Sequence, residues 1–106
     1  MEIIGRYPET SVSEIVRSEP NFHPDPHPML EIIERNAEAI TGKKPEQIIG
    51  LGATDARLWR HRGFPAFVYG PSPAGMGGRN EAVLIEEFLT IVKVHALSAF
   101  DYLSGT

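Results

Sequence analysis

Four prolines within ten residues divide the chain before any helix or sheet is considered. The segment 19–28, EPNFHPDPHP, holds prolines at positions 20, 24, 26 and 28. A proline lacks an amide hydrogen and fixes its φ angle, so this segment must be extended and cannot donate a continuous ladder of hydrogen bonds. We therefore interpret residues 19–28 as a linker between a short part, residues 1–18, and a larger unit, residues 29–106.

Composition limits the functions that are open to this chain. Its 106 residues suffice for one small domain, and 42% hydrophobic with 23% charged residues excludes intrinsic disorder. The absence of cysteine excludes disulfides, thiolate metal sites and a cysteine nucleophile. A net charge of −4 argues against a nucleic-acid partner. Without a membrane-spanning run or a signal-peptide pattern, we expect a cytoplasmic protein.

Two helices are predicted from apolar periodicity. In residues 29–41, Met29, Ile33, Ala37 and Ile40 share one face, and Gly42 follows as the terminating residue. A final helix over 85–103 has an apolar stripe made of Ile85, Phe88, Leu89, Val92, Ala96, Ala99 and Leu103. Further apolar residues lie off that stripe, namely Leu84, Ile91, Val94 and Leu97. A helix that is apolar on two sides indicates a partner, either a companion chain or a second copy.

The middle of the chain predicts an α/β fold. The apolar run 47–51 and the run 65–69 have the length of buried strands, and a helix over 55–62, capped by Thr54 and ended by Gly63, lies between them. We expect a β-α-β unit with a parallel, right-handed crossover at the centre of a three-layer α/β fold. A short strand over 2–7 and a two-turn helix near 12–16 are expected before the linker.

Candidate site residues lie where the predicted strands end. Thr54, Asp55 and Arg57 offer a hydroxyl, a carboxylate and a guanidinium, and Arg57 could clamp a substrate carboxylate through two hydrogen bonds. A capped helix with a local Asp55–Arg57 contact explains the same residues without a ligand. The glycine-rich loop after the second strand contains Gly75, Met76, Gly77 and Gly78, and Asn80 and Glu81 follow it.

The histidines give little sign of a metal site. His23 and His27 are four residues apart, but the prolines forbid a helix there, and an extended chain separates the rings by about 13 Å. We interpret both as solvated linker residues, and His61 and His95 as surface or helix-capping groups. No catalytic residue and no metal ligand is assigned to this chain.

A resemblance goes beyond these patterns. Thr54-Asp55-Ala56-Arg57, Gly63-x-Pro65, Gly70-Pro71 and Asn80-Glu81 followed by IEEFL occur in the order seen near the end of one enzyme family. The chain is similar to the dinuclear zinc amidohydrolases and peptidases, which include acetylornithine deacetylase, succinyl-diaminopimelate desuccinylase and glutamate carboxypeptidase. Residues 1–18 resemble the end of the family's lid and dimerisation domain, and 29–106 the C-terminal part of its catalytic domain.

The resemblance implies a role in binding rather than a complete active site. Thr54, Asp55 and Arg57, with Asn80 and Glu81, resemble positions that contact substrate or border the metal. Full-length relatives use zinc, but Gly77 stands where many carry a histidine ligand, and this chain lacks the other ligands and the glutamate base. We expect a C-terminal segment of a hydrolase of N-acyl amino acids or peptides, inactive alone and completed by a companion chain. The alternative is a non-catalytic module for small carboxylates or for oligomerisation.

Overall fold

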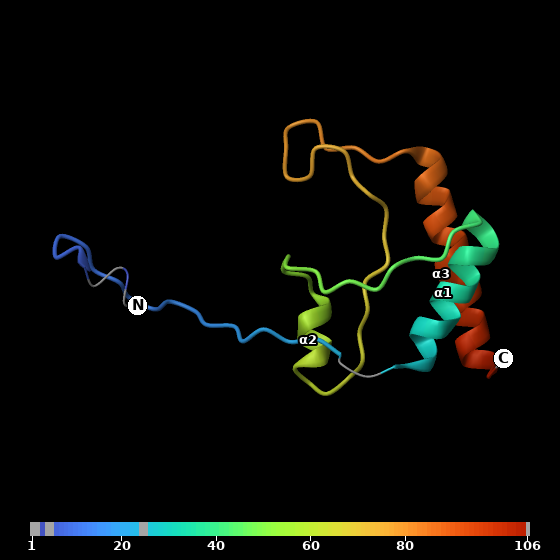
Figure 1. Cartoon of the computed structure of the whole chain (residues 1–106), viewed down its shortest axis with the longest axis horizontal. Helices are drawn as coiled ribbons and strands as arrows, with labels where there is room; N and C mark the ends of the chain where they lie inside the picture. Colours follow the sequence, from blue (N-terminus) through green and yellow to red (C-terminus); the bar gives the residue numbers. More distant parts are fainter. Residues whose placement is uncertain (1–2, 4–5, 24–25, 106) are drawn as a thin grey trace.

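The computed structural model describes residues 3, 6–23 and 26–105 and contains three helices in these ranges. They are α1 (Pro28–Thr41), α2 (Ala56–Arg60) and α3 (Ile85–Ser104). Helices α1 and α3 lie side by side, whereas α2 stands apart from them on a long excursion of the chain (Figure 1). The helices predicted over 29–41 and 85–103 are therefore confirmed, with one residue added at one end of each.

The predicted α/β fold is wrong. Residues 47–51 and 65–69 are extended, but no strand forms in the described part of the chain, so the β-α-β unit and its three layers are absent. The described residues contain one isolated antiparallel bridge, between Ala74 and Ala82. Two short apolar runs are only marginally stable as a sheet without further strands to pair with. Side chains bond to some of their backbone groups, as where Arg60 donates to the carbonyl of Ala66.

Helix α1 has a defined beginning and end. The Nδ1 atom of His27 accepts a hydrogen bond of 3.2 Å from the amide of Met29, and Pro28 follows at the first helical position. At the other end, Gly42 has a φ of 73° and its amide donates to the carbonyl of Glu38. Gly42 is thus the terminating residue that the sequence predicts.

The contact between α1 and α3 has a small apolar centre and a polar network. Ala37 and Val94 are fully buried, and Asn36 and Ser98 are buried beside them. The Nδ2 group of Asn36 donates to Ser98 Oγ at 3.2 Å and to Asp101 Oδ2 at 3.0 Å. Directional hydrogen bonds between two buried polar residues fix how one helix is placed along the other, because sliding would leave both without partners.

The face of α3 that contacts α1 differs from the predicted one. Val94, expected off the apolar stripe, is the residue buried against α1, while the stripe itself is exposed. Phe100 adjoins the stripe on the same side of the helix, and we call the combined surface the outer face of α3. Its members are Ile85, Phe88, Leu89, Val92, Ala96, Ala99, Phe100 and Leu103, all of them exposed.

The part before the linker forms no helix. Residues 12–16 are extended, with Ile15 95% and Val16 86% exposed, so the helix expected near 12–16 is wrong. The strand expected over 2–7 lies partly outside the described residues. In the described residues of this part, the amide of Arg6 donates to the carbonyl of Ile3, and the amide of Thr10 donates to the carbonyl of Tyr7. Both hydrogen bonds close turns. Residues 6–20 run away from the rest of the molecule (Figure 1).

The molecule is open and buries little of its surface. Its accessible surface is 9184 Å², against about 5,900 Å² for a compact protein of this mass. The radius of gyration is 18.6 Å, against about 13 Å for a compact domain of this length. Within the described residues, none of the helices combines the length and the apolarity that crossing a membrane requires.

Candidate functional site

The turn that carries Thr54, Asp55 and Arg57 leads into α2. The amide of Arg57 donates to the carbonyl of Thr54 at 3.1 Å, and that of Leu58 to Asp55 at 3.0 Å. Asp55 is the capping residue, although its side chain makes no capping bond, so the predicted cap at Thr54 is wrong. Helix α2 has five residues, fewer than the predicted 55–62, and a helix this short provides little dipole to hold an anion.

Arg57 is oriented by its own turn. Its Nη1 group donates to the Thr54 carbonyl at 3.2 Å and lies 3.7 Å from Asp55 Oδ1. The Arg57 side chain is 39% exposed and that of Asp55 92% exposed, so this ion pair is a weak one in water. Within the described residues, Arg57 Nε and Nη2 have no hydrogen-bond partner. That edge of the guanidinium remains available to the two oxygens of a carboxylate.

A polar network that was not predicted from the sequence fastens α2 to the linker. The Oδ1 atom of Asn21 accepts from Arg60 Nε at 2.7 Å, and Asn21 Nδ2 donates to the carbonyl of Arg57 at 3.3 Å. Arg60 Nη1 also donates to the carbonyl of Ala66 at 2.7 Å. Asn21 and Arg60 thereby connect the linker, α2 and the extended segment 65–69.

The glycine loop is closed by its own backbone and by Glu81. Ala74 and Ala82 exchange two hydrogen bonds, of 2.8 and 3.1 Å, and Glu81 Oε2 accepts from the amide of Gly77 at 3.0 Å. Gly75 and Gly77 have φ angles of 67° and 72°, which favour glycine. Met76, Gly78 and Asn80 are exposed on the same loop. The Glu81 carboxylate therefore has a structural partner as well as a free oxygen.

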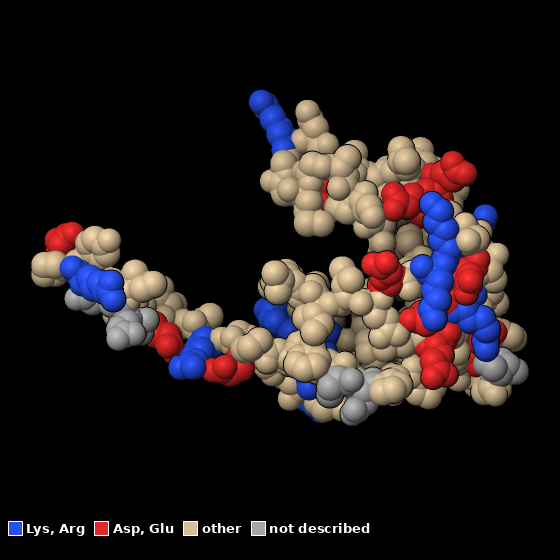
Figure 2. Space-filling view, in the orientation of Figure 1, with Lys and Arg blue, Asp and Glu red and all other residues tan. Residues whose placement is uncertain are grey.

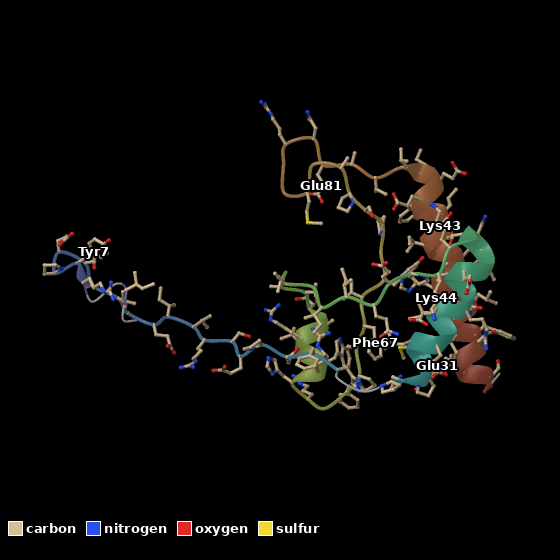
Figure 3. All side chains as sticks on the ribbon, in the orientation of Figure 1. Tyr7, Glu31, Lys43, Lys44, Phe67 and Glu81 are labelled. Atoms are coloured by element: carbon tan, nitrogen blue, oxygen red, sulfur yellow. The ribbon has the colours of Figure 1, made fainter. Side chains whose placement is uncertain are left out.

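The two halves of the predicted site do not meet. Arg57 and its turn belong to the lobe around α2, whereas Glu81 lies on the glycine loop, well apart from Phe67 near α2 (Figure 3). An open gap separates these lobes in the space-filling view (Figure 2). In the described ranges, no three His, Cys, Asp or Glu side chains come together to hold a metal ion. The residues present do not fit the zinc centre that the resemblance implies, and we derive no step through zinc.

The two linker histidines are closer than predicted. Their ring centroids are 5.6 Å apart, not about 13 Å, and each ring also contacts Phe67, at 5.4 Å for His23 and 5.5 Å for His27. Both are partly buried, so the prediction of solvated residues is wrong for this pair. His95 Nε2 lies 2.8 Å from the carbonyl of Tyr69, so it donates to that oxygen, while His61 is exposed.

Charged side chains gather over α1 rather than at the predicted site (Figure 2). Glu34 accepts from Gln47 at 2.6 Å and pairs with Lys44 at 3.1 Å, and these contacts lower the pKa of its carboxyl. A hollow of about 340 Å³ between α1 and the end of α3 is lined by Glu31, Ile32, Arg35, Asp101 and Tyr102. Arg35 and Asp101 form an ion pair with each other at 2.9 Å, so the two charges that they bring to the hollow are already paired.

The polar contacts that organise the fold had only weak signals in the sequence. Asn36 falls on the apolar face predicted for residues 29–41, and a polar residue there is a sign of a buried partner. Asn21 carried no such sign, because the linker has no periodicity. In comparisons with known proteins, no protein-family model matches this chain, nor does any curated protein or solved structure.

Proposed function

We propose that this chain is the C-terminal segment of a metal-dependent hydrolase of N-acyl amino acids or peptides. In this proposal Arg57 binds the substrate carboxylate, the glycine loop forms part of the site wall, and a companion polypeptide carries the catalytic groups and the zinc. The chain alone is inactive. The support is the ordered string of motifs from Thr54 to Glu81, together with the geometry of the Arg57 turn. The proposal places the enzyme in the cytoplasm.

One observation carries the need for a companion. The chain exposes about 3,300 Å² more surface than a compact protein of its mass. Large apolar side chains before and after the Arg57 turn in the sequence are exposed: Leu51 fully, Ile48 81%, Val68 67% and Trp59 58%. Exposure of so many large apolar side chains is typical of a surface that a partner protein covers. A companion that covers these residues would also bring its own groups next to Arg57.

Arg57 suits a carboxylate for reasons of geometry. Its Nη1 group is held by the Thr54 carbonyl, which restricts the guanidinium before any ligand arrives. The free Nε and Nη2 edge has the spacing of a carboxylate, and paired hydrogen bonds between charged groups are among the strongest in proteins. Asp55 competes for the guanidinium only weakly, because it is exposed and 3.7 Å away.

The test is reconstitution with the product of the neighbouring reading frame. We expect that co-expression with this companion gives zinc-dependent deacylation of N-acyl amino acids, and that Arg57→Ala raises KM at least tenfold. Arg62→Ala, which removes an exposed arginine of the same stretch, is the matched control and should leave KM unchanged. Deacylation by the purified chain without a second polypeptide would contradict the proposal.

The alternative, a non-catalytic module that binds small carboxylates, rests on the same arginine. It needs no companion and no metal. Isothermal titration of the chain with N-acetylated amino acids separates the two proposals. Binding without turnover that is abolished by Arg57→Ala and retained by Arg62→Ala favours the module. The absence of binding by the chain alone, with activity on reconstitution, favours the hydrolase segment.

A further inference from the structure

We propose that Asn21 is a positioning residue for Arg57, so that the linker sets the geometry of the carboxylate site. This inference rests on the proposed role of Arg57 in binding a substrate carboxylate. The side chain of Asn21 reaches α2 from 36 residues earlier in the chain, where its Nδ2 group donates to the carbonyl of Arg57 at 3.3 Å. Asn21 thus holds the backbone of Arg57 rather than its guanidinium, and it acts on a substrate only through Arg57.

Helix α2 needs support from outside its own turn. It has five residues and no side-chain cap at its beginning, and a helix this short does not persist alone, because starting a helix costs more than its few hydrogen bonds return. Within the described ranges, α2 packs against neither α1 nor α3. The linker supplies the missing support, since Asn21 bonds both to the carbonyl of Arg57 and to the side chain of Arg60.

A carboxamide at position 21 suits these two partners. Arg57 and Arg60 are three residues apart, a spacing that places both on one side of a helix. Arg60 Nε can only donate and the carbonyl of Arg57 can only accept, so the oxygen of Asn21 must face Arg60 and its nitrogen must face Arg57. Asn21 and Arg60 are half-buried, and their 2.7 Å hydrogen bond involves a charged group, which makes it one of the stronger kind.

The linker also holds the segment that follows α2. Arg60 Nη1 donates to the carbonyl of Ala66 at 2.7 Å, and the ring of Phe67, the next residue, lies 5.4 Å from the ring of His23. Asn21 and His23 are two residues apart, a spacing that places side chains on one side of an extended chain. The contacts therefore run from Asn21 through α2 and segment 65–69 back to His23. Helix α2 cannot move relative to the linker without breaking one of them.

Hydrogen exchange of the full chain tests the support of α2 without a companion or a substrate. In Asn21→Ala, the amides of Leu58 and His61, which bond within the α2 turn, should exchange at least about threefold faster. The amide of Gly42, which ends α1, should be unchanged. Ser18→Ala, at an exposed residue shortly before the linker, is the matched control. Equal exchange at α2 in the two variants would overturn the proposal.

Kinetics of the enzyme reconstituted with its companion test the effect on Arg57. Asn21→Ala should raise KM at least about threefold with kcat nearly unchanged, because Arg57 binds the carboxylate equally in the ground state and the transition state. Added to Arg57→Ala, it should raise KM no further, since no guanidinium remains to be positioned. A purely structural loss would instead lower kcat through the fraction of folded enzyme, and would do so in both backgrounds.

The outcomes separate this inference from the proposed function. Additive effects of Asn21→Ala and Arg57→Ala on KM, or a KM in Asn21→Ala equal to that of Ser18→Ala, would reject the positioning of Arg57 by Asn21. If Arg57→Ala itself leaves KM unchanged while Asn21→Ala still speeds exchange in α2, the proposed function is rejected and the support of α2 by Asn21 is retained.

Discussion

Asn36 shows at the scale of one residue how a single amide can position two helices. It is 4% exposed, and its Nδ2 group bonds to both Ser98 and Asp101 on α3. The apolar contact around it is small, since Ala37 and Val94 are the buried apolar residues of the described chain. The polar network therefore supplies a large share of what holds α1 and α3 in register.

Replacing Asn36 by alanine should destabilise the α1–α3 pair by about 1–3 kcal/mol, because Ser98 and Asp101 each lose a hydrogen bond in a partly buried place. Urea unfolding followed by circular dichroism measures this change. Glu38→Ala, on the exposed side of α1, is the control and should cost little. An Asn36→Ala variant as stable as the control would show that the network contributes nothing.

Asp101 should make stability depend on pH. Hydrogen bonds from Asn36 and then Arg35 lower its pKa below the ordinary value of 3.8. A carboxyl whose pKa is lowered by folding stabilises the folded state above the ordinary value, and this contribution is lost as the pH falls through the lower folded value. Glu34, with its pKa lowered from 4.5 by Gln47 and Lys44, acts in the same direction.

Unfolding free energies measured from neutral pH to about pH 2 should therefore fall on acidification. Asp101→Asn should flatten part of this dependence. An NMR titration that places the Asp101 pKa at or above 3.8 would contradict the assignment.

The residues of the candidate site could be predicted only in part. The local Asp55–Arg57 contact followed from their spacing, and the structure has it at 3.7 Å. The contact of His23 with His27 could not be predicted, because it depends on Phe67, which lies forty residues further along the chain. Contacts between segments far apart in sequence leave no periodic trace in either one.

At the scale of elements, the glycine loop over 74–82 depends on close approach of its backbone. A Cβ atom at Gly78 would lie 2.9 Å from the carbonyl oxygen of Gly75, closer than side chains tolerate, and Gly78 donates its amide to that same carbonyl. Gly78→Ala should therefore open the turn and release the bond between Gly77 and Glu81.

Hydrogen exchange at Ala74 and Ala82 should become faster in Gly78→Ala, because these amides form the bridge that closes the loop. Gly70→Ala is the matched control, since nothing lies within 4 Å of a Cβ atom there and its φ is ordinary. Equal exchange in the two variants would contradict the role given to Gly78.

The sequence predicted the two long helices correctly and the strands wrongly. A helix satisfies its backbone within itself, so the apolar period and Gly42 were enough to place α1 and α3. A strand needs a neighbour, and the apolar runs 47–51 and 65–69 have none in this structure. Periodicity also could not tell which of two apolar sides of α3 faces α1, because that choice depends on Asn36.

At the scale of the whole molecule, an open shape is the consequence of these unpaired elements. Segments 43–55 and 61–84 span wide distances without the strand pairing that would draw them together (Figure 1). Residues 6–20 extend from the body, and large side chains such as Ile15 and Val16 stay in water. Little apolar surface is buried by closing such a chain on itself, so the entropy of the segments is not overcome.

Small-angle X-ray scattering should detect this openness directly. At low protein concentration the chain should have a radius of gyration near 18.6 Å rather than about 13 Å. A shortened chain that begins at Asn21 should scatter as a distinctly smaller particle, because residues 6–20 lie far from the centre of mass. A value near 13 Å for the full-length monomer would show that the chain closes on itself. Such closure would cover the apolar residues around Arg57 and remove the reason for a companion.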